Sequence, residues 1–326
     1  MMKFPRRRFL HLAAGAAALP AVSRFAWAQN YPTRPVRIIV GFPAGGTTDI
    51  AARLIAQALS ERLGQQFVVE NRPGASTNLA VEAVVRAPGD GYTLLAASAT
   101  NTINVSLFEK LNFNFIRDIV MVAGLVSSPL VLEVHPSVPV KTVPELIAYA
   151  KANPGKVTLA SFGVGTTSHV AGELFKMMTG VNMLHVPYRG SAPLVTDLIG
   201  GQVQAAVDNL PASIEHIRAG KLRALAVTTA ARSEALPEIP TLAQYLPGFE
   251  ASAWITIGAP RSTPAPIVDK LNREINAALA DPKIKARTAE LGAAVYPGLP
   301  GDFGKLVAEE TEKWAKVVKF AGIKPE

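Results

Sequence analysis

The chain contains 326 residues, which is enough for about two domains. Apolar residues make up 49% of the chain and charged residues 18%, so it can bury a large core and is not globally disordered. It has no cysteine, which excludes disulfide bonds, thiolate metal sites and a cysteine nucleophile.

The first 28 residues have the composition of an export signal. A basic segment at 3–8 precedes an alanine-rich apolar run over 12–22. The small residues at 26 and 28 predict cleavage after Ala28. The letters RRRFL at 6–10 resemble a twin-arginine signal, and an ordinary Sec signal is the alternative. The sequence therefore predicts an exported protein.

Removal of this segment changes the charge balance. It carries five basic residues and no acid, so cleavage lowers the formal net charge from +8 to +3. A charge this small and this evenly spread does not indicate nucleic-acid binding, but it suits small anionic ligands. No later apolar run reaches the length of about 18 residues that a membrane helix needs.

Short β-like runs alternate with amphipathic helical patterns, which predicts a mainly parallel α/β architecture. The predicted strands are 36–42, 67–74, 91–98, 129–136, 156–163, 181–188, 203–211, 222–229 and 252–260. The predicted helices are 48–64, 142–155, 167–180, 192–201, 212–220 and 300–322, and the segment 264–292 contains one helix and the start of another.

The sequence contains an internal repeat at an offset of 120 residues. The letters FPAGGTTDIA at 42–51 align without gaps with FGVGTTSHVA at 162–171, and the match continues along the apolar face of the following helix. Farther on, VENR at 69–72 corresponds to VPYR at 186–189. Both copies pass from an apolar strand into a helix, so the repeat predicts two similar lobes.

Each repeat contains a loop that can bind an anion. The first turn of a helix has unpaired N–H groups, and its dipole favours negative charge. Gly45 and Gly46 allow close approach of a ligand to the first loop. Either loop alone could be a plain turn with a Thr or Ser cap, but two matched loops facing one cleft favour a carboxylate site. Pro43 breaks the dinucleotide pattern, and no triphosphate-binding loop is present.

Catalytic patterns are weak. The chain has no G-x-S-x-G elbow. His169 and Glu173 stand four residues apart and His185 follows, but a zinc pattern with a third ligand at a recognisable spacing is missing. We predict no catalytic residue, no metal and no cofactor. Asp208, at a strand end, could bind a ligand amine or hydroxyl or could hold a loop, and both interpretations remain open.

These motifs resemble the solute-binding receptors of tripartite tricarboxylate transporters, the Bug-type periplasmic binding proteins. The resemblance covers about 31–319. It is carried by YPTRPVRIIVGFPAGGTTDIAARLIAQ, VVENRPGA, GYTLL, FGVGTTSHVAGELF, HVPYRGSAP, DLIGGQVQAAVDNLP and GKLRALAVTT.

The resemblance implies a two-lobe periplasmic-binding-protein (Venus-flytrap) fold with mainly parallel sheets and crossing hinge strands. After the signal at 1–28, lobe 1 would comprise 29–130 plus 253–326, and lobe 2 would comprise 131–252.

The implied protein is not an enzyme. It would capture a small carboxylate in the periplasm, between its lobes, and deliver it to the membrane permease of a tripartite transporter, acting as a monomer without nucleic acid. The alternatives are an exported α/β enzyme acting on a carboxylated substrate and a receptor for a non-acidic solute.

The resemblance also implies the ligand-binding residues. They form two loops and three further positions: Phe42, Pro43, Ala44, Gly45, Gly46, Thr47, Thr48 and Asp49; Gly163, Gly165, Thr166, Thr167, Ser168 and His169; and Tyr188 and Asp208, with Ser76 and Thr77 as candidates on a third loop. The family usually has NRPGAGGNIG where this chain has NRPGASTNLA, so Ser76, Thr77 and Ala80 replace glycines. We therefore expect a smaller or more polar ligand at this loop.

Overall fold

The computed structural model describes residues 31–108 and 110–324, so the predicted export signal and its cleavage site lie outside the described residues. The upper sheet contains strands β1 (Val36–Val40), β2 (Phe67–Asn71) and β3 (Thr93–Ser98), which are parallel. Two antiparallel strands, β9 (Ser252–Pro260) and the first part of β4 (Ile119–Val134), extend the sheet in the order β2-β1-β3-β9-β4, and β10 (Ala294–Val295) pairs with β4.

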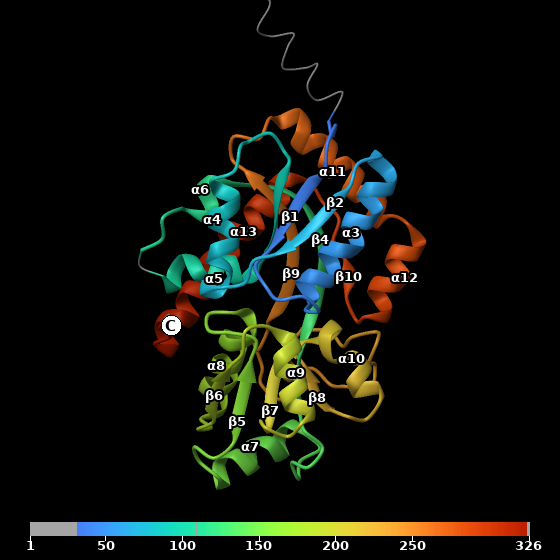
Figure 1. The fold of residues 1–326 in the computed structure, drawn as a ribbon. Helices are drawn as coiled ribbons and strands as arrows, with labels where there is room; N and C mark the ends of the chain where they lie inside the picture. The colour runs from blue at the N-terminus through green and yellow to red at the C-terminus, as the bar shows by residue number, and fades with distance from the viewer. Residues whose placement is uncertain (1–30, 109, 325–326) are drawn as a thin grey trace, which may run out of the picture.

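The lower sheet is built in the same way. Strands β5 (Thr158–Ser161), β6 (Leu184–Pro187) and β7 (Ala205–Asn209) are parallel, in the order β7-β5-β6. The second part of β4 runs antiparallel to β7 and to β8 (Arg223–Val227). The molecule is therefore a two-lobe α/β protein, and β4 and β9 run between the lobes (Figure 1).

Helices cover both sheets. Those of the upper lobe are α3 (Thr47–Leu63), α4 (Asn78–Val85), α5 (Ala99–Leu107), α6 (Phe115–Asp118), α11 (Ala265–Leu279), α12 (Pro282–Glu290) and α13 (Pro300–Ala321), with the short turn η1 (Ala75–Thr77). Those of the lower lobe are α7 (Val143–Ala152), α8 (Thr167–Thr179), α9 (Ser191–Ile199) and α10 (Leu210–Arg218), with η2 (Leu242–Gln244). Among the described residues, no helix has the length and apolar character needed to cross a membrane.

Strand β4 differs most from its prediction. It begins at Ile119, whereas the sequence pattern predicted a strand at 129–136. Gly124 and the polar pair Ser127 and Ser128 interrupt the apolar run, so the sequence pattern does not reveal the first half of the strand. Pro129 is the last residue of β4 paired with β9, and Leu130 is the first paired with β7. Proline lacks a donor for the ladder, and here it stands where the strand changes partners.

Every predicted element overlaps an observed one, but several observed elements were not predicted: helices α4, α5 and α6, the turns η1 and η2, and strand β10. The sequence of α5, ATNTINVSL, is rich in Thr and Asn, which have low helix propensity. The helix begins where Asn101 accepts a hydrogen bond from the backbone N–H of Ser98 (2.8 Å). It also buries Ile103 and Leu107 against the lower-lobe core. Tertiary burial therefore outweighs its weak intrinsic preference.

Candidate functional site

The two predicted ligand loops have the same backbone design. The first leaves β1 and begins α3, and the second leaves β5 and begins α8. The residues before the helices, Gly46 and Thr166, have almost equal angles, with φ −83° for both and ψ 166° and 165°. Gly45 and Gly165 each have a positive φ, 88° and 70°, which favours glycine. The geometry therefore repeats as the sequence does.

In the first loop, Asp49 braces its own turn. The backbone N–H of Gly45 donates to its carboxylate (3.0 Å), and Arg53 and Asn71 donate to the same group. Burial alone would raise the pKa of Asp49, but these hydrogen bonds outweigh it and hold the pKa below its usual value. The side chain thus accepts hydrogen bonds from its own loop and from the neighbouring strand.

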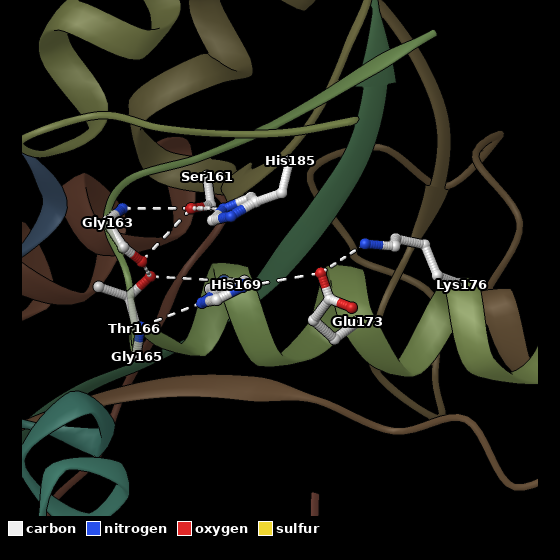
Figure 2. A network of polar contacts seen from close by, with 8 residues as sticks. All are labelled: Ser161, Gly163, Gly165, Thr166, His169, Glu173, Lys176 and His185. Carbon is white, nitrogen blue, oxygen red and sulfur yellow. Dashed lines mark hydrogen bonds and ion pairs between the residues drawn. The ribbon is translucent and has the colours of Figure 1, made fainter. Parts of the chain in front are cut away.

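In the second loop, His169 has the equivalent position (Figure 2). The backbone N–H of Gly165 donates to its Nδ1 (3.1 Å), and its Nε2 lies 3.6 Å from Oε1 of Glu173. The ring stacks on His185, with ring centroids 3.8 Å apart and planes 4° apart. Ser161 Oγ lies 2.7 Å from Nε2 of His185.

This polar network has shifted pKa values. Burial, followed by the charge of His169, lowers the pKa of His185 to about 3. Burial would raise the pKa of Glu173, but the neighbouring His169 and Lys176 outweigh it and lower the pKa to about 2. The ring of His185 is therefore neutral near pH 7, and Glu173 is charged and paired with Lys176 (2.7 Å).

A cavity of about 480 Å³ lies between the lobes. It is lined by predicted residues of both loops and of the third loop: Phe42, Pro43, Ser76, Thr77, Gly163, Thr166 and Tyr188. It is also lined by residues that sequence reasoning did not select: Gly41, Pro73, Gly74, Ala75, Phe108, Val164, Pro187 and Arg189. A volume of this size is in the range of small-molecule sites. Arg189 is an exposed cation in the motif HVPYRGSAP. This motif is the sequence signal that could have identified it as a residue of the cavity wall.

A second, smaller cavity of about 20 Å³ lies next to the first, and Phe42 and Pro43 line both. It is lined by the beginning of α3, at Gly46, Thr47 and Thr48. From the lower lobe it is lined by Phe162 after β5, Ser191 and Ala192 at the start of α9, and Asn209 at the end of β7. Oγ1 of Thr47 and Oδ1 of Asn209 are buried there without a hydrogen-bond partner among the described residues. The cavity can hold about one water-sized group, and the two unpaired oxygens in its wall are available to hydrogen-bond to that group.

Several predicted site residues do not line either cavity. Ala44 and Gly45 lie on the exposed side of their loop. Ser168 donates to the carbonyl of Val207 and so ties α8 to β7. The others have buried positions behind the loops: Asp49, Gly165, Thr167, His169 and Asp208.

The third loop holds its hydroxyl groups in internal bonds. Ser76 Oγ donates across the cleft to the carbonyl of Val164 (2.6 Å), and Thr77 Oγ1 accepts from Asn101 (2.8 Å). Ala75, Ser76 and Thr77 all have positive φ, at 45°, 48° and 77°. Positive φ favours glycine, and Ser76 and Thr77 stand where the family pattern has glycines, whereas Ala75 matches that pattern. Ser76 links the two lobes directly.

Asp208 lies in the lower-lobe interior. Its Oδ1 accepts hydrogen bonds from Ser191 Oγ and from the N–H of Asn209 (2.5 and 2.8 Å), and its Oδ2 has no partner among the described residues. Burial raises its pKa to about 7, although these hydrogen bonds act in the opposite direction. This carboxyl group holds the start of α9 to the end of β7. No group of three or more metal-ligating side chains occurs within 31–108 and 110–324.

Comparisons with known proteins agree on one family. The model of the tripartite tricarboxylate transporter family receptor matches residues 51–323. The chain is 40% identical to the protein BugT of Bordetella pertussis (strain Tohama I) over 300 residues, 91% of this chain and 92% of BugT.

Two solved structures are similar over their full length. The R. palustris protein Rpa4515, solved with adipate, has a TM-score of 0.88 and 42% identity, over 91% of this chain and 100% of that one. MatC of Rhodopseudomonas palustris, solved with malate, has a TM-score of 0.83 and 34% identity, over 88% of this chain and 100% of that one. The matched family is one of solute-binding receptors and not of enzymes.

Proposed function

Because the chain belongs to the tripartite tricarboxylate transporter receptor family, we propose that it is a periplasmic receptor for a small carboxylate. Two relatives support the ligand class, since they were solved with adipate and with malate. The solute would bind between the lobes and then pass to the membrane permease of a tripartite transporter, with the receptor acting as a monomer.

One observation carries the proposal: the two helix-initiating loops lie at one cleft between the lobes. The first-turn N–H groups of α3 and α8 are directed away from their own helices, and both helix dipoles favour an anion. The larger cavity between the loops has the volume of a small organic acid site, and Arg189 adds a positive charge at its wall. A carboxylate is the anion that these donors suit.

We assign different tasks to the predicted site residues. Those that line the cavities would contact the solute, chiefly through backbone N–H groups at Gly46, Thr47 and Thr48. Asp49 and His169 would hold the loops in place, because their side chains already accept hydrogen bonds from Gly45 and Gly165.

The lobes would move about the strands that connect them. We propose a division near 130 and 253, supported by the change of partners in β4 between Pro129 and Leu130. Closure would bring Ser76 to Val164 as in the present structure.

Thermal unfolding of the protein from Gln29 onward, against a panel of carboxylates and their uncharged amides, tests this function. A ligand that binds only the native state at about 100 times its Kd stabilises it by roughly 2.7 kcal/mol. We expect one acid to raise the midpoint by several degrees and its amide to have no effect. If an acid and its amide stabilise equally, the carboxylate proposal is wrong.

Gly46→Val supplies the matched test of the site. Gly46 has an ordinary φ of −83°, and an added Cβ would have only the carbonyl oxygen of Pro43 nearby, at 3.9 Å, so the variant should fold. Its side chain would enter the small cavity and should abolish the ligand-induced shift. Gly304→Val, on α13 with open space around it, is the control and should bind as the wild type does. Wild-type affinity in Gly46→Val would contradict this placement.

A further inference from the structure

Arg189 lies on a short segment that contacts both ligand loops. Before it, the backbone N–H of Tyr188 donates to the last carbonyl of β5 (2.8 Å). After it, the N–H of Gly190 donates to the carbonyl of Phe162, at the start of the second loop (3.1 Å). Gly190 also faces the first loop, because a Cβ added to it would lie 3.0 Å from Cδ of Pro43. The backbone on both sides is therefore fixed, and Arg189 lines the larger cavity.

The internal repeat shows what distinguishes this arginine. It aligns the letters VENR with VPYR, so that Arg189 is the counterpart of Arg72. Arg72 forms an ion pair with Glu70 (2.7 Å) and lines neither cavity. The counterpart of Glu70 is Pro187, which carries no charge. The lower lobe thus keeps the cation of this pair and lacks its anion.

In the part of the chain that the structure describes, no acid pairs with this arginine. Asp197, the next acid along the chain, accepts a hydrogen bond from the hydroxyl of Tyr188 (2.9 Å). The acids behind the loops, Asp49 and Glu173, have cationic partners of their own. Asp208 is completely buried in the lower lobe. Among the described residues that line the larger cavity, the arginine is the only charged one.

The charge of the site favours a solute with two negative charges. A helix N-terminus acts as roughly half a positive charge, so the two helix starts at the cleft together balance one carboxylate. Arg189 adds one full positive charge at the cavity wall. A monocarboxylate would leave this cation without a partner when the lobes close. A second carboxylate would instead bind the guanidinium through charge-assisted hydrogen bonds.

We propose that Arg189 is a specificity-determining residue that binds a second carboxylate, so that the receptor selects diacids over monoacids. This inference rests on the proposed function, because it requires the first carboxylate of the solute to bind at the paired loops. It goes beyond that function in assigning the second charge of the solute to one residue.

Titration calorimetry with matched ligands tests this selectivity. The probes are adipate and its straight-chain homologues, each compared with its monoamide, which has nearly the same shape and one charge fewer. At neutral pH both carboxyl groups of a diacid are ionised. We expect a diacid to bind about five- to tenfold more tightly than its monoamide, as for one partly exposed charged hydrogen bond. Equal affinities within each pair would overturn the proposal.

Arg189→Gln removes the charge from the cavity wall. The side chain is exposed and forms no hydrogen bond among the described residues, so the variant should fold. It should bind a diacid about five- to tenfold more weakly than the wild type does, with the affinity for the monoamide nearly unchanged. Arg189→Lys keeps the charge and should recover part of the loss. Equal weakening of diacid and monoamide would indicate a structural role alone and would contradict the proposal.

Arg72→Gln is the matched control. It removes the counterpart of Arg189 in the repeat, which is likewise exposed but lies outside both cavities. This variant should bind the diacid and the monoamide as the wild type does. If it weakened diacid binding as much as Arg189→Gln, the net charge of the protein and not the position of Arg189 would set the selectivity.

The proposed function and the role of Arg189 fail in different ways. If no acid of the thermal-unfolding panel binds, the proposed function is wrong and this inference falls with it. If an acid binds but diacids have no advantage over monoacids, the proposed function stands and only the role of Arg189 is wrong.

Discussion

Glu133 and Asp208 lie on the same face of neighbouring strands in the lower lobe, on β4 and β7. Both side chains are fully buried, and Ser213 donates a hydrogen bond to Oε1 of Glu133 (2.7 Å). Burial, then the charge of Asp208, raises the pKa of Glu133 well above its usual value. The carboxyl groups of Glu133 and Asp208 therefore bind protons more tightly in the native state than in the unfolded chain.

This linkage predicts a pH effect on stability. When pH rises above the ordinary value of a glutamate, about 4.5, the unfolded chain releases the proton of Glu133 and the native state keeps it. The free energy of unfolding should therefore fall as pH rises, and the loss should be recovered in acid. Glu133→Gln cannot ionise, so it should lose less stability than the wild type between about pH 5 and 8. Urea unfolding at both pH values measures this difference.

The comparison with the wild type isolates this residue, because Asp208 is present in both proteins. Glutamine can also accept the hydrogen bond from Ser213, so the variant should fold. Equal losses of stability in the two proteins over that range would show that Glu133 does not bind its proton more tightly in the native state.

Among the elements, helix α13 connects the two lobes. It belongs to the upper lobe in Figure 1, yet Trp314 and Val318 join the core of the lower lobe. Trp314 is completely buried and donates from Nε1 to Glu310 (2.7 Å). Helix α5 contributes Ile103 and Leu107 to the same core. On this helix the side-chain amides of Asn101 and Asn104 also support the strained third loop. They donate hydrogen bonds to Oγ1 of Thr77 and to the carbonyl of Ser76, respectively.

Truncation of the tryptophan should therefore destabilise the whole protein. We expect Trp314→Ala to lower the free energy of unfolding by about 3–5 kcal/mol, the usual effect of removing a large buried aromatic side chain. Phe320→Ala is the matched control, because this side chain on the same helix is 70% exposed and its loss should cost about 0.5 kcal/mol or less. Urea unfolding at neutral pH measures both, and similar effects in the two variants would contradict the role given to α13.

In the whole molecule, the position of the cleft between the lobes links the binding of a solute to the closure of the lobes. The cavity is lined by loops of both lobes, and Ser76 bridges them to Val164. A ligand that contacts both loops binds the closed arrangement more tightly than an open one and shifts the population toward it.

X-ray scattering can measure this coupling. We expect a saturating solute to decrease the radius of gyration of the wild type, because contacts with both loops stabilise closure. Gly46→Val at the same solute concentration should show no decrease. A wild-type radius that is independent of the solute would show that binding and closure are not coupled.

The sequence by itself determined the local features. The alternation of strands and helices follows from short-range apolar periodicity, and the 120-residue repeat marks the two helix-initiating loops without any knowledge of the fold. The family motifs added the two-lobe architecture. The start of β4 was missed because Gly124, Ser127 and Ser128 interrupt its apolar run. Helix α5 was missed because its stability depends on burial against distant partners.

Only the tertiary structure decided which way the loop side chains face. The resemblance implied that Asp49 and His169 bind the ligand, and in the structure both side chains lie behind their loops, as acceptors for Gly45 and Gly165. The pairing of Ser76 with Val164, across 88 residues, is likewise invisible to local pattern. The physical reason is that a hydrogen bond depends on distance and direction in space, which the fold sets, whereas the sequence specifies only which groups can donate or accept.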